Sequence, residues 1–346
     1  MNKLTTFDVL IVYAQGLARS AYHTSKHLAP FAVGSRNESY NIVYGYFLKT
    51  CQDFGLKAGF TTSADIIGPG FCRSFWQYTD GVWIKSNTPC FSKLIFDKFS
   101  PINSDIALRR QLLFSSPDIK PFNHPGLYDL FFDKQKTYNR LSSYAIPTVC
   151  LDSSTLSGIK NACQTLAEMV GRHSSTDFSL DLIMKDRFGA GGRHIHKFKS
   201  NSYQEILATA QKHQAVSYIL QPFTNFNAVD IRLVYLRGKI IQSYIRVAKP
   251  GEFRCNEHCG GLLTYQTLDK IPATVLAKAD QIARSLNNTC SLFTLDFIVG
   301  DSGDVYLLEG NTGPGLDWNM SIEKNEIEAK KLINLVVKEL TVRAKV

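Results

Sequence analysis

Short apolar runs and one helical repeat organise the first third of the chain. Residues 8–13 are a brief apolar run, which predicts a buried β-strand. Residues 43–54 carry large apolar side chains every three to four positions, which is typical of a helix. Residues 93–99 are another strand candidate, and residues 105–115 have a helical pattern. The pattern predicts an α/β domain.

A segment rich in proline and glycine, residues 117–126, marks the predicted end of this domain, so that residues 1–125 form the first of three domains. Helices and strands then alternate in a central domain, residues 126–222. Its helices are expected at 133–144, 153–172 and 201–213, and its strands at 148–151, 180–185, 194–198 and 218–221.

The last domain, residues 223–346, is expected to be rich in strands. Residues 222–228 look like a connector into it. The elements expected after this connector are a hairpin of 230–236 with 239–247, a helix over 272–286, a hairpin of 292–299 with 305–309, and a closing helix from 322.

Composition excludes several classes of protein. With 346 residues, 44% of them hydrophobic and 20% charged, the chain is typical of a globular protein of two or three domains. The net charge of +9 suits phosphate-bearing or acidic ligands, but no arginine-rich tail or lysine block suggests a nucleic-acid partner. The apolar runs are far shorter than the roughly 20 residues that a membrane helix needs, so no membrane partner is expected.

The eight cysteines show no paired framework, which indicates reduced thiols and a cytoplasmic protein. Cys255 and Cys259 bracket His258, but their spacing is not that of a usual zinc site.

Two acids in adjoining strands are the sharpest chemical signal. Asp296 lies within one apolar strand, and Glu309 and Asn311 lie two positions apart in its hairpin partner. Paired antiparallel strands bring such positions together, and two buried acids repel each other unless a cation lies between them. Carboxylate oxygens with phosphate and water are what Mg²⁺ prefers. The pattern favours a magnesium site over ordinary polar residues at strand ends.

Two further segments carry positive charge beside glycine. Lys185 ends an apolar strand before the glycine-rich residues 188–192, where backbone N–H groups could approach phosphate, although such hairpin tips are common. Asp230 and Arg232 precede a loop rich in hydrogen-bond donors. Such donors suit phosphate and carboxylate groups, and this interpretation is favoured over that of a basic loop exposed to solvent. These donors are Arg246, Lys249, Arg254, Asn256 and His258.

Taken in this order, the residues resemble the ATP-grasp superfamily. The resemblance is to the branch that includes the ribosomal-protein S6 glutamate ligase, the lysine-biosynthesis amino-group carrier ligase and, more distantly, glutathione synthetase. It covers roughly residues 133–315. The segments that carry it are DK (133–134) with AIP (145–147), Lys185 with 189–192, DIR (230–232) through KPGEFRCN (249–256) to GG (260–261), and EGNTGPG (309–315).

The resemblance implies an α/β chain with an ATP-grasp fold, in which an N-terminal α/β domain precedes two α+β lobes that clasp a nucleotide. It implies ATP and two Mg²⁺ ions, with Mn²⁺ as a substitute. The implied nucleotide-binding residues are Lys134, Lys185, Gly189, Gly191, Gly192, Gln221, Pro222, Phe223 and, at the ribose, Asp230. Arg232, Arg254 and Asn256 are the implied catalytic residues, and Asp296, Glu309 and Asn311 the implied metal ligands.

Three positions depart from the pattern of that branch. Pro222 stands where an acid is usual, so contact with adenine must rely on Gln221 or Phe223. His194 replaces the last glycine of the turn, which predicts a stiffer lid and an added phosphate contact. Gly313 stands where a small hydroxyl residue or alanine is commoner. No metal ligand or phosphate-binding lysine is lost, so we expect an active enzyme.

The implied reaction is ATP-dependent ligation of a carboxylate to an amine through an acyl phosphate, with release of ADP and phosphate. The implied partners are a small-molecule carboxylate, such as an amino acid or peptide, and an amine acceptor. A homo-oligomer is compatible with the sequence. Two alternatives stay open, namely an ATP-grasp kinase of a polyanionic alcohol and a catalytically silent nucleotide-binding module. Residues 1–125 carry no recognised motif that identifies the substrates.

Overall fold

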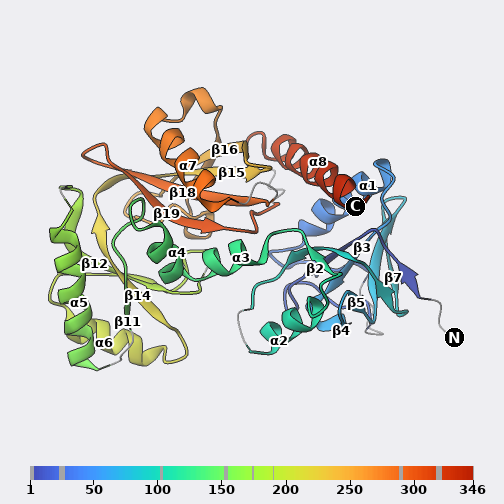
Figure 1. Cartoon of the computed structure of the whole chain (residues 1–346), viewed down its shortest axis with the longest axis horizontal. Helices are drawn as coiled ribbons and strands as arrows, with labels where there is room; N and C mark the ends of the chain where they lie inside the picture. Colours follow the sequence, from blue (N-terminus) through green and yellow to red (C-terminus); the bar gives the residue numbers. More distant parts are fainter. Residues whose placement is uncertain are drawn as a thin grey trace. The chain divides into compact units, whose positions relative to one another are not determined.

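The computed structural model describes residues 4–22, 28–101, 104–151, 155–173, 175–189, 191–287, 291–316 and 322–345. The chain forms two compact units (Figure 1). The first comprises Met1–Pro125, Cys290–Leu292 and Gly313–Val346, and the second comprises Gly126–Thr289 and Phe293–Thr312. The predicted helix start at 153, Ala190 of the glycine-rich turn, and Cys290 lie outside the described residues. The division into three domains at residues 125 and 222 stays a prediction.

A six-stranded sheet forms the centre of the first unit. Its order is β10-β9-β2-β3-β6-β7, in which β10, β9, β2 and β3 run parallel and β6 and β7 are antiparallel. The strands are β2 (Val9–Tyr13), β3 (Ala58–Thr62), β6 (Phe75–Thr79), β7 (Val82–Ser86), β9 (Leu94–Lys98) and β10 (Lys120–Pro121). Every residue of β2 and β3 is buried, as expected for strands covered on both faces.

The first unit also holds a small sheet and three α-helices. The sheet order is β1 (Thr5–Thr6), β8 (Cys90–Phe91), β5 (Phe71–Cys72) and β4 (Ile66–Gly68). The helices are α1 (Tyr40–Asp53), α2 (Ser104–Leu113) and α8 (Asn325–Arg343), with a 3₁₀ turn η1 (Ser63–Asp65). Asn334 of α8 donates to the hydroxyl of Tyr46 in α1 at 3.0 Å, so the end of the chain packs on this unit.

A four-stranded antiparallel sheet opens the second unit. Its order is β11 (Val149–Leu151), β14 (Tyr218–Thr224), β12 (Phe178–Asp186) and β13 (Ile195–Phe198). Helices α5 (Leu156–Gly171) and α6 (Tyr203–Lys212) cover one face, where Met184 and Leu220 pack against Ile159 and Ile206 (Figure 1). The other face is left for the cavity described below.

A five-stranded antiparallel sheet completes the second unit. Its order is β17 (Leu262–Tyr265), β16 (Lys239–Val247), β15 (Phe226–Leu236), β18 (Phe293–Gly300) and β19 (Val305–Asn311). Leu233 and Leu295 share a core with Ile282 of α7 (Ala273–Leu286). The same core takes in α3 (Pro125–Phe132) and α4 (Lys134–Leu141), and the connecting turns include the 3₁₀ helices η2 (Glu257–Cys259) and η3 (Leu268–Lys270).

The predicted hairpins are present, and the differences from expectation are local. The predicted connector over residues 222–228 is instead the end of β14 and the start of β15, separated only by Asn225. The end of β14 is a strand because Pro222 and Thr224 are buried and pair with β12, and β15 begins at Phe226, which pairs with Gly300 of β18. The sequence reading missed the β6–β7 hairpin, although Asp80 and Gly81 at its turn have φ of 52° and 82° and form a typical hairpin dipeptide. No helix in the described part of the chain combines the length and hydropathy of a membrane span.

Candidate active site

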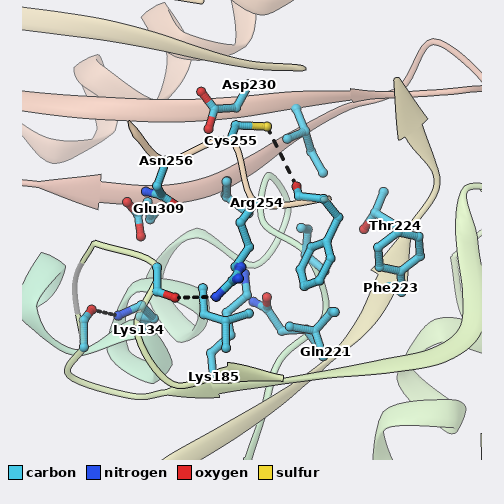
Figure 2. A pocket seen from close by; sticks show the side chains of 18 of the residues that line it. Lys134, Lys185, Gln221, Phe223, Thr224, Asp230, Arg254, Cys255, Asn256 and Glu309 are labelled. Atoms are coloured by element: carbon cyan, nitrogen blue, oxygen red, sulfur yellow. Dashed lines mark hydrogen bonds between the residues drawn. The ribbon is translucent and has the colours of Figure 1, made fainter. Parts of the chain in front are cut away.

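The two sheets of the second unit enclose a cavity (Figure 2). The cavity is open to solvent on one side, and both apolar and polar side chains line it. Its apolar lining includes Ile146, Ile183, Ile298 and Leu308, which come from four separate segments of the chain. Charged and amide side chains line the rest, so the cavity offers an apolar slot that opens into a polar chamber.

The four-stranded sheet forms the first wall of the cavity, and the alternation of side chains along its strands decides which of them face the cavity. Met184 and Leu220 face the helices, so their neighbours Ile183, Lys185 and Gln221 face the cavity. Ile183 lies directly opposite Gln221 in the antiparallel pairing of β12 with β14. The cavity face of this sheet therefore carries an apolar side chain, an amide and a cation, supplied by Ile183, Gln221 and Lys185.

Two lysines point into the polar chamber (Figure 2). Burial and the nearby charge of Lys134 together lower the pKa of Lys185 to about 8, although Glu309 opposes the shift. Burial also lowers the pKa of Lys134, against the charges of Glu309, Asp186 and Asp133. Lys134 donates to the carbonyl of Gly189, so the first turn of α4 is tied to the glycine-rich turn. Both lysines are desolvated cations, which gain most from an anionic ligand.

The carboxylate of Asp133 fixes this arrangement. It caps the N-terminus of α4 by accepting from the backbone N–H of Gln135 at 2.9 Å, and it takes both ends of the Arg187 guanidinium at 2.7 Å. The backbone N–H of Lys134 donates to the carbonyl of Arg187 at 3.1 Å. Arg187, which the sequence reading missed, thus joins the segment before α4 to the end of β12, and its only signal was its position two residues after Lys185.

The glycine-rich turn packs against the loop that carries Arg254 and Asn256. Gly191 and Gly192 have φ of 69° and 74°, which favours glycine. A Cβ atom on Gly192 would lie 3.0 Å from Oδ1 of Asn256 and 3.1 Å from Sγ of Cys259. Arg254 donates to the carbonyl of Gly192 at 3.2 Å and to Glu252 at 2.6 Å. The turn and the loop therefore close one end of the chamber together.

Arg254 keeps one donor unused. Its Nε atom is buried and has no hydrogen-bond partner among the described residues. Its bond to Glu252 lowers the pKa of that carboxyl to about 2, so the pair stays ionised. A buried guanidinium N–H without a partner is uncommon and favours an acceptor supplied from the cavity.

The five-stranded sheet forms the second wall of the cavity, and it carries a network of buried ion pairs. Arg246 forks onto both oxygens of Asp230 at 2.7 and 2.8 Å and also donates to Asp296 at 2.8 Å. Arg232 binds Asp296 with two bonds, the Nε bond to Oδ1 measuring 2.6 Å. Burial opposes ionisation of Asp296, yet the two arginines hold its pKa below the usual range. Burial raises the pKa of Asp230 to about 6 despite Arg246.

Glu309 lies at the cavity side of this network. It is directly opposite Asp296 in the pairing of β18 with β19, and one of its oxygens lies 3.6 Å from Arg232. The amide nitrogen of Asn311 donates to Glu309 at 3.1 Å, which leaves the amide oxygen of Asn311 for another partner. Within the described residues no three or more His, Cys, Asp and Glu side chains are grouped to hold a metal ion. The predicted magnesium ligands, Asp296, Glu309 and Asn311, are two carboxylates and an amide.

The structure brings most predicted site residues to one cavity. The residues that line it are Lys134, Lys185, Gly189, Gly191, Gly192, Gln221, Pro222, Phe223, Asp230, Arg254, Asn256 and Glu309. Arg232, Asp296 and Asn311 are not among its lining residues but neighbour Glu309: Asp296 pairs with it across β18 and β19, and Arg232 and Asn311 contact its carboxylate.

His194 lies outside the lining of the cavity, so its predicted phosphate contact has no support in the structure and stays a prediction. His194 has φ of 52° and does not line the cavity, and its ring packs 5.1 Å from the ring of His213. The residue still occupies the left-handed conformation that glycine would take, but its side chain is directed to α6. Sequence reasoning also missed the apolar slot, whose four residues are ordinary core residues by their local pattern.

Solved structures with this fold define the class of protein. D-cycloserine synthetase DcsG matches with a TM-score of 0.60 at 13% identity, covering 97% of this chain and 99% of that one. D-alanyl-alanine synthetase A from Vibrio cholerae matches with a TM-score of 0.61 at 16% identity, covering 98% and 99%. The ligase PsnB, solved with Mg and ADP, matches with a TM-score of 0.54 at 10% identity, covering 96% and 98%. The chain therefore has the ATP-grasp fold.

The sequence comparisons identify the family within that class. The model of the RimK-like ATP-grasp domain matches residues 133–336, more than half of the chain, so the chain belongs to the RimK-like ATP-grasp family. A probable alpha-L-glutamate ligase from Shewanella pealeana is 32% identical over 139 residues, which cover 39% of this chain and 29% of the relative. Another from Hahella chejuensis is 27% identical, covering 46% of this chain and 50% of the relative. The alignments thus span half or less of these two relatives.

Proposed function

We propose that this chain is an ATP-dependent carboxylate–amine ligase that forms an amide bond through an acyl phosphate and releases ADP and phosphate. The observation that carries the proposal is the cavity in the second unit, which two desolvated lysines, the glycine-rich turn and Glu309 line together. Membership in the RimK-like family supports it.

The cavity fits a nucleotide in shape and charge. Ile146, Ile183, Ile298 and Leu308 would enclose a flat base between the two sheets. Asp230 would face the ribose, although its carboxylate is already bonded to Arg246 and would have to share. Lys134, Lys185 and the turn at Gly189, Gly191 and Gly192 would contact the phosphates, because desolvated cations and backbone N–H groups both suit anions.

Two of the three predicted metal ligands, Glu309 and Asn311, have oxygen atoms available for Mg²⁺. Glu309 at the cavity and the amide oxygen of Asn311 are hard oxygen donors of the kind that the ion prefers. Asp296 is held by two arginines, so it would join the set only by giving up a bond to Arg232. Bound there with phosphate oxygens, the two ions would neutralise charge on the phosphates.

The remaining chemistry is positioning by this chain's own residues. A carboxylate oxygen of the substrate attacks the γ-phosphorus of ATP, the bond to the ADP oxygen breaks, and an acyl phosphate forms. The buried Nε of Arg254 would donate to an oxygen of the transferring group, with Asn256 beside it and Arg232 orienting the acids behind Glu309. The amine then attacks the acyl carbon, phosphate leaves, and the amine loses a proton.

A hollow next to the chamber is lined by basic side chains, which supports an anionic carboxylate substrate. Arg193, Lys249 and His258 line a neighbouring hollow together with Arg254. The curated relatives are named as probable alpha-L-glutamate ligases. We therefore propose an amino acid or a peptide as the carboxylate and an amine acceptor as the second partner. The unpaired cysteine framework of the sequence supports a cytoplasmic setting.

The test is turnover with defined substrate pairs. The protein is incubated with ATP, Mg²⁺ and pairs of amino acids and peptides, while ADP and the product mass are measured. Glu309→Gln should abolish ADP release, because the oxygen donor set loses its charge at the cavity. The matched control Glu323→Gln changes an exposed acid and should keep full activity. Normal ADP release by Glu309→Gln would contradict the proposal, and a stable phosphorylated product without an amine would indicate a kinase.

A further inference from the structure

A buried carboxylate lies where the two sheets of the second unit meet. Asp177, the residue before β12, is 1% exposed. Its oxygens accept from the backbone N–H and from the hydroxyl of Ser302 at 2.7 and 2.6 Å, and Ser302 lies in the turn between β18 and β19. The two residues are 125 positions apart, so folding alone brings them together, and their bonds join the four-stranded sheet to the five-stranded one.

Further hydrogen bonds gather at the same point. The hydroxyl of Tyr306 in β19 donates to Asp177 at 3.0 Å, and the hydroxyl of Ser175 donates to it at 3.2 Å. The backbone of Asn225, the single residue between β14 and β15, donates to the carbonyl of Asp177 at 2.8 Å and accepts from Asp301 at 3.2 Å. The chain therefore passes from one sheet to the other inside this group of contacts. We call the group the joint, and its members are Ser175, Asp177, Asn225, Asp301, Ser302 and Tyr306.

The carboxylate of Asp177 stays ionised in the joint although it is buried. Burial opposes ionisation, but the bonds from Ser302, Tyr306 and Ser175 hold the pKa of this carboxyl below its usual range. Hydrogen bonds to an ionised acceptor are about twice as strong as those between neutral groups. A Cβ atom on Gly300 would lie 2.0 Å from Oδ2 of Asp177, and only glycine lets this strand end come so close without displacing the carboxylate. The joint is thus tightly packed as well as hydrogen-bonded.

The joint lies next to the apolar slot of the cavity. Tyr306 is directly opposite Ile298 in the pairing of β18 with β19, and both belong to one core cluster with Ile146. Ile298 and Ile146 line the slot. Phe178, the residue after Asp177, belongs to the same cluster, and its ring lies 5.1 Å from the ring of Tyr306. A change at the joint would therefore reach the side chains of the slot through direct contacts.

We propose that Asp177 is a positioning residue for nucleotide binding, which fixes the two sheets at the spacing that the apolar slot needs. The inference rests on the proposed nucleotide site and deepens it. Asn225 alone separates β14 from β15, and so short a connection would act as a hinge if no bonds bridged it. Asp177 bridges it and acts on the ligand through Tyr306 and the slot. Its loss should weaken binding of the apolar part of the nucleotide and leave the phosphate chamber unchanged.

The test measures the Kd of Mg-ATP by calorimetry and that of Mg-tripolyphosphate by competition with Mg-ATP, well below the melting temperature of each variant. Asp177→Ala removes the joint, so Mg-ATP should bind about tenfold more weakly. Mg-tripolyphosphate has no group for the slot and should bind as it does to the wild type. Asp177→Asn keeps an acceptor for the backbone N–H of Ser302 and offers an NH₂ group to the hydroxyls, so it should restore most of the affinity.

Two further variants keep the result interpretable. Ser243→Ala removes a different buried bond in the second unit, to the carbonyl of Gln266 at 2.7 Å. It should lower the melting temperature and leave both Kd values unchanged. Ser302→Ala removes one bond of the joint and should weaken Mg-ATP to a smaller degree than Asp177→Ala, so it serves as the test if Asp177→Ala does not fold.

The outcomes separate this inference from the proposed function. If the wild type binds Mg-ATP and the joint variants bind it equally well, the positioning role is overturned while the nucleotide site stands. The role is also overturned if Asp177→Ala weakens Mg-ATP and Mg-tripolyphosphate by the same factor, because the slot would then not be what the joint positions. If the wild type does not bind Mg-ATP, the proposed function fails and this inference fails with it.

Discussion

The two walls of the chamber carry charge in different ways. On the four-stranded side Lys185 is desolvated and its pKa falls to about 8, and among the described residues Glu309 supplies the charge that opposes this shift. On the five-stranded side Asp230, Arg232, Arg246 and Asp296 are buried in direct ion pairs. A charge paired within the protein stabilises the fold only while both partners stay, whereas a charge left without a direct partner is available to a ligand. We therefore infer that the charges of the first wall serve ligand binding, whereas those of the second wall stabilise the fold.

Removing Arg246 should have the largest effect on stability. Arg246→Met leaves Asp230 and Asp296 buried with fewer partners, and breaking such pairs costs roughly 3–5 kcal/mol. Urea unfolding of the two proteins measures the difference. Arg284→Met removes an exposed i,i+4 partner of Asp280 and should change stability by less than about 0.5 kcal/mol. Equal stability of Arg246→Met and wild type would show that the second wall does not depend on its ion pairs.

Removing Lys185 should separate binding from folding. Lys185→Met takes away a desolvated cation, so the free energy of unfolding should stay level or rise while ATP binding weakens at least about tenfold. Calorimetry with Mg-ATP and thermal unfolding are measured on the same preparation. Lys199→Met, at an exposed position on the same sheet region, should change neither quantity appreciably. A variant that loses stability and keeps its affinity for ATP would reverse the assignment of the first wall.

The Asp133–Arg187 pair gives a smaller effect that depends on pH. Burial opposes ionisation of Asp133, but bonds from Arg187 and two backbone N–H groups leave its pKa lowered. A carboxyl with a lowered folded pKa stabilises the protein above its unfolded pKa of about 3.9 and loses this contribution as pH falls toward the folded pKa. Wild type should therefore exceed Asp133→Asn by about 1–3 kcal/mol at pH 7.

That difference should be constant from pH 5 to pH 8 and should shrink as the pH is lowered below about 4. Denaturant unfolding at a series of pH values measures it. A difference that grows toward acid would mean that Asp133 is neutral in the folded protein and that its bond to Arg187 is not ionic.

Local patterns were enough to find the class of protein. The prediction of an ATP-grasp fold, which rested on the resemblance of the ordered motifs in residues 133–315, is confirmed by the family model and by the solved structures. The pairing of Asp296 with Glu309 followed from two apolar strands joined by a tight turn. The roles of the individual site residues and the three-domain division stay predictions.

Other features could not be read from the sequence. His194 looked like a phosphate contact because of its place in the turn, but its backbone conformation directs the ring to His213. Arg187 looked like an ordinary charged residue until folding placed Asp133 beside it. In both cases the decisive fact is a side-chain direction, which depends on residues outside the local window.

The sequence by itself determined the three hairpins of the second unit, the charges along their strands and the acids that face each other across the last hairpin, because these depend on neighbours a few residues away. Only the tertiary structure decided which charges are paired and which face the cavity, and how the two sheets are joined beside it. Those features depend on contacts such as Asp177 with Ser302, between residues 125 positions apart. Hydrogen-bond direction and burial are properties of the packed chain, and no periodicity in the sequence encodes them.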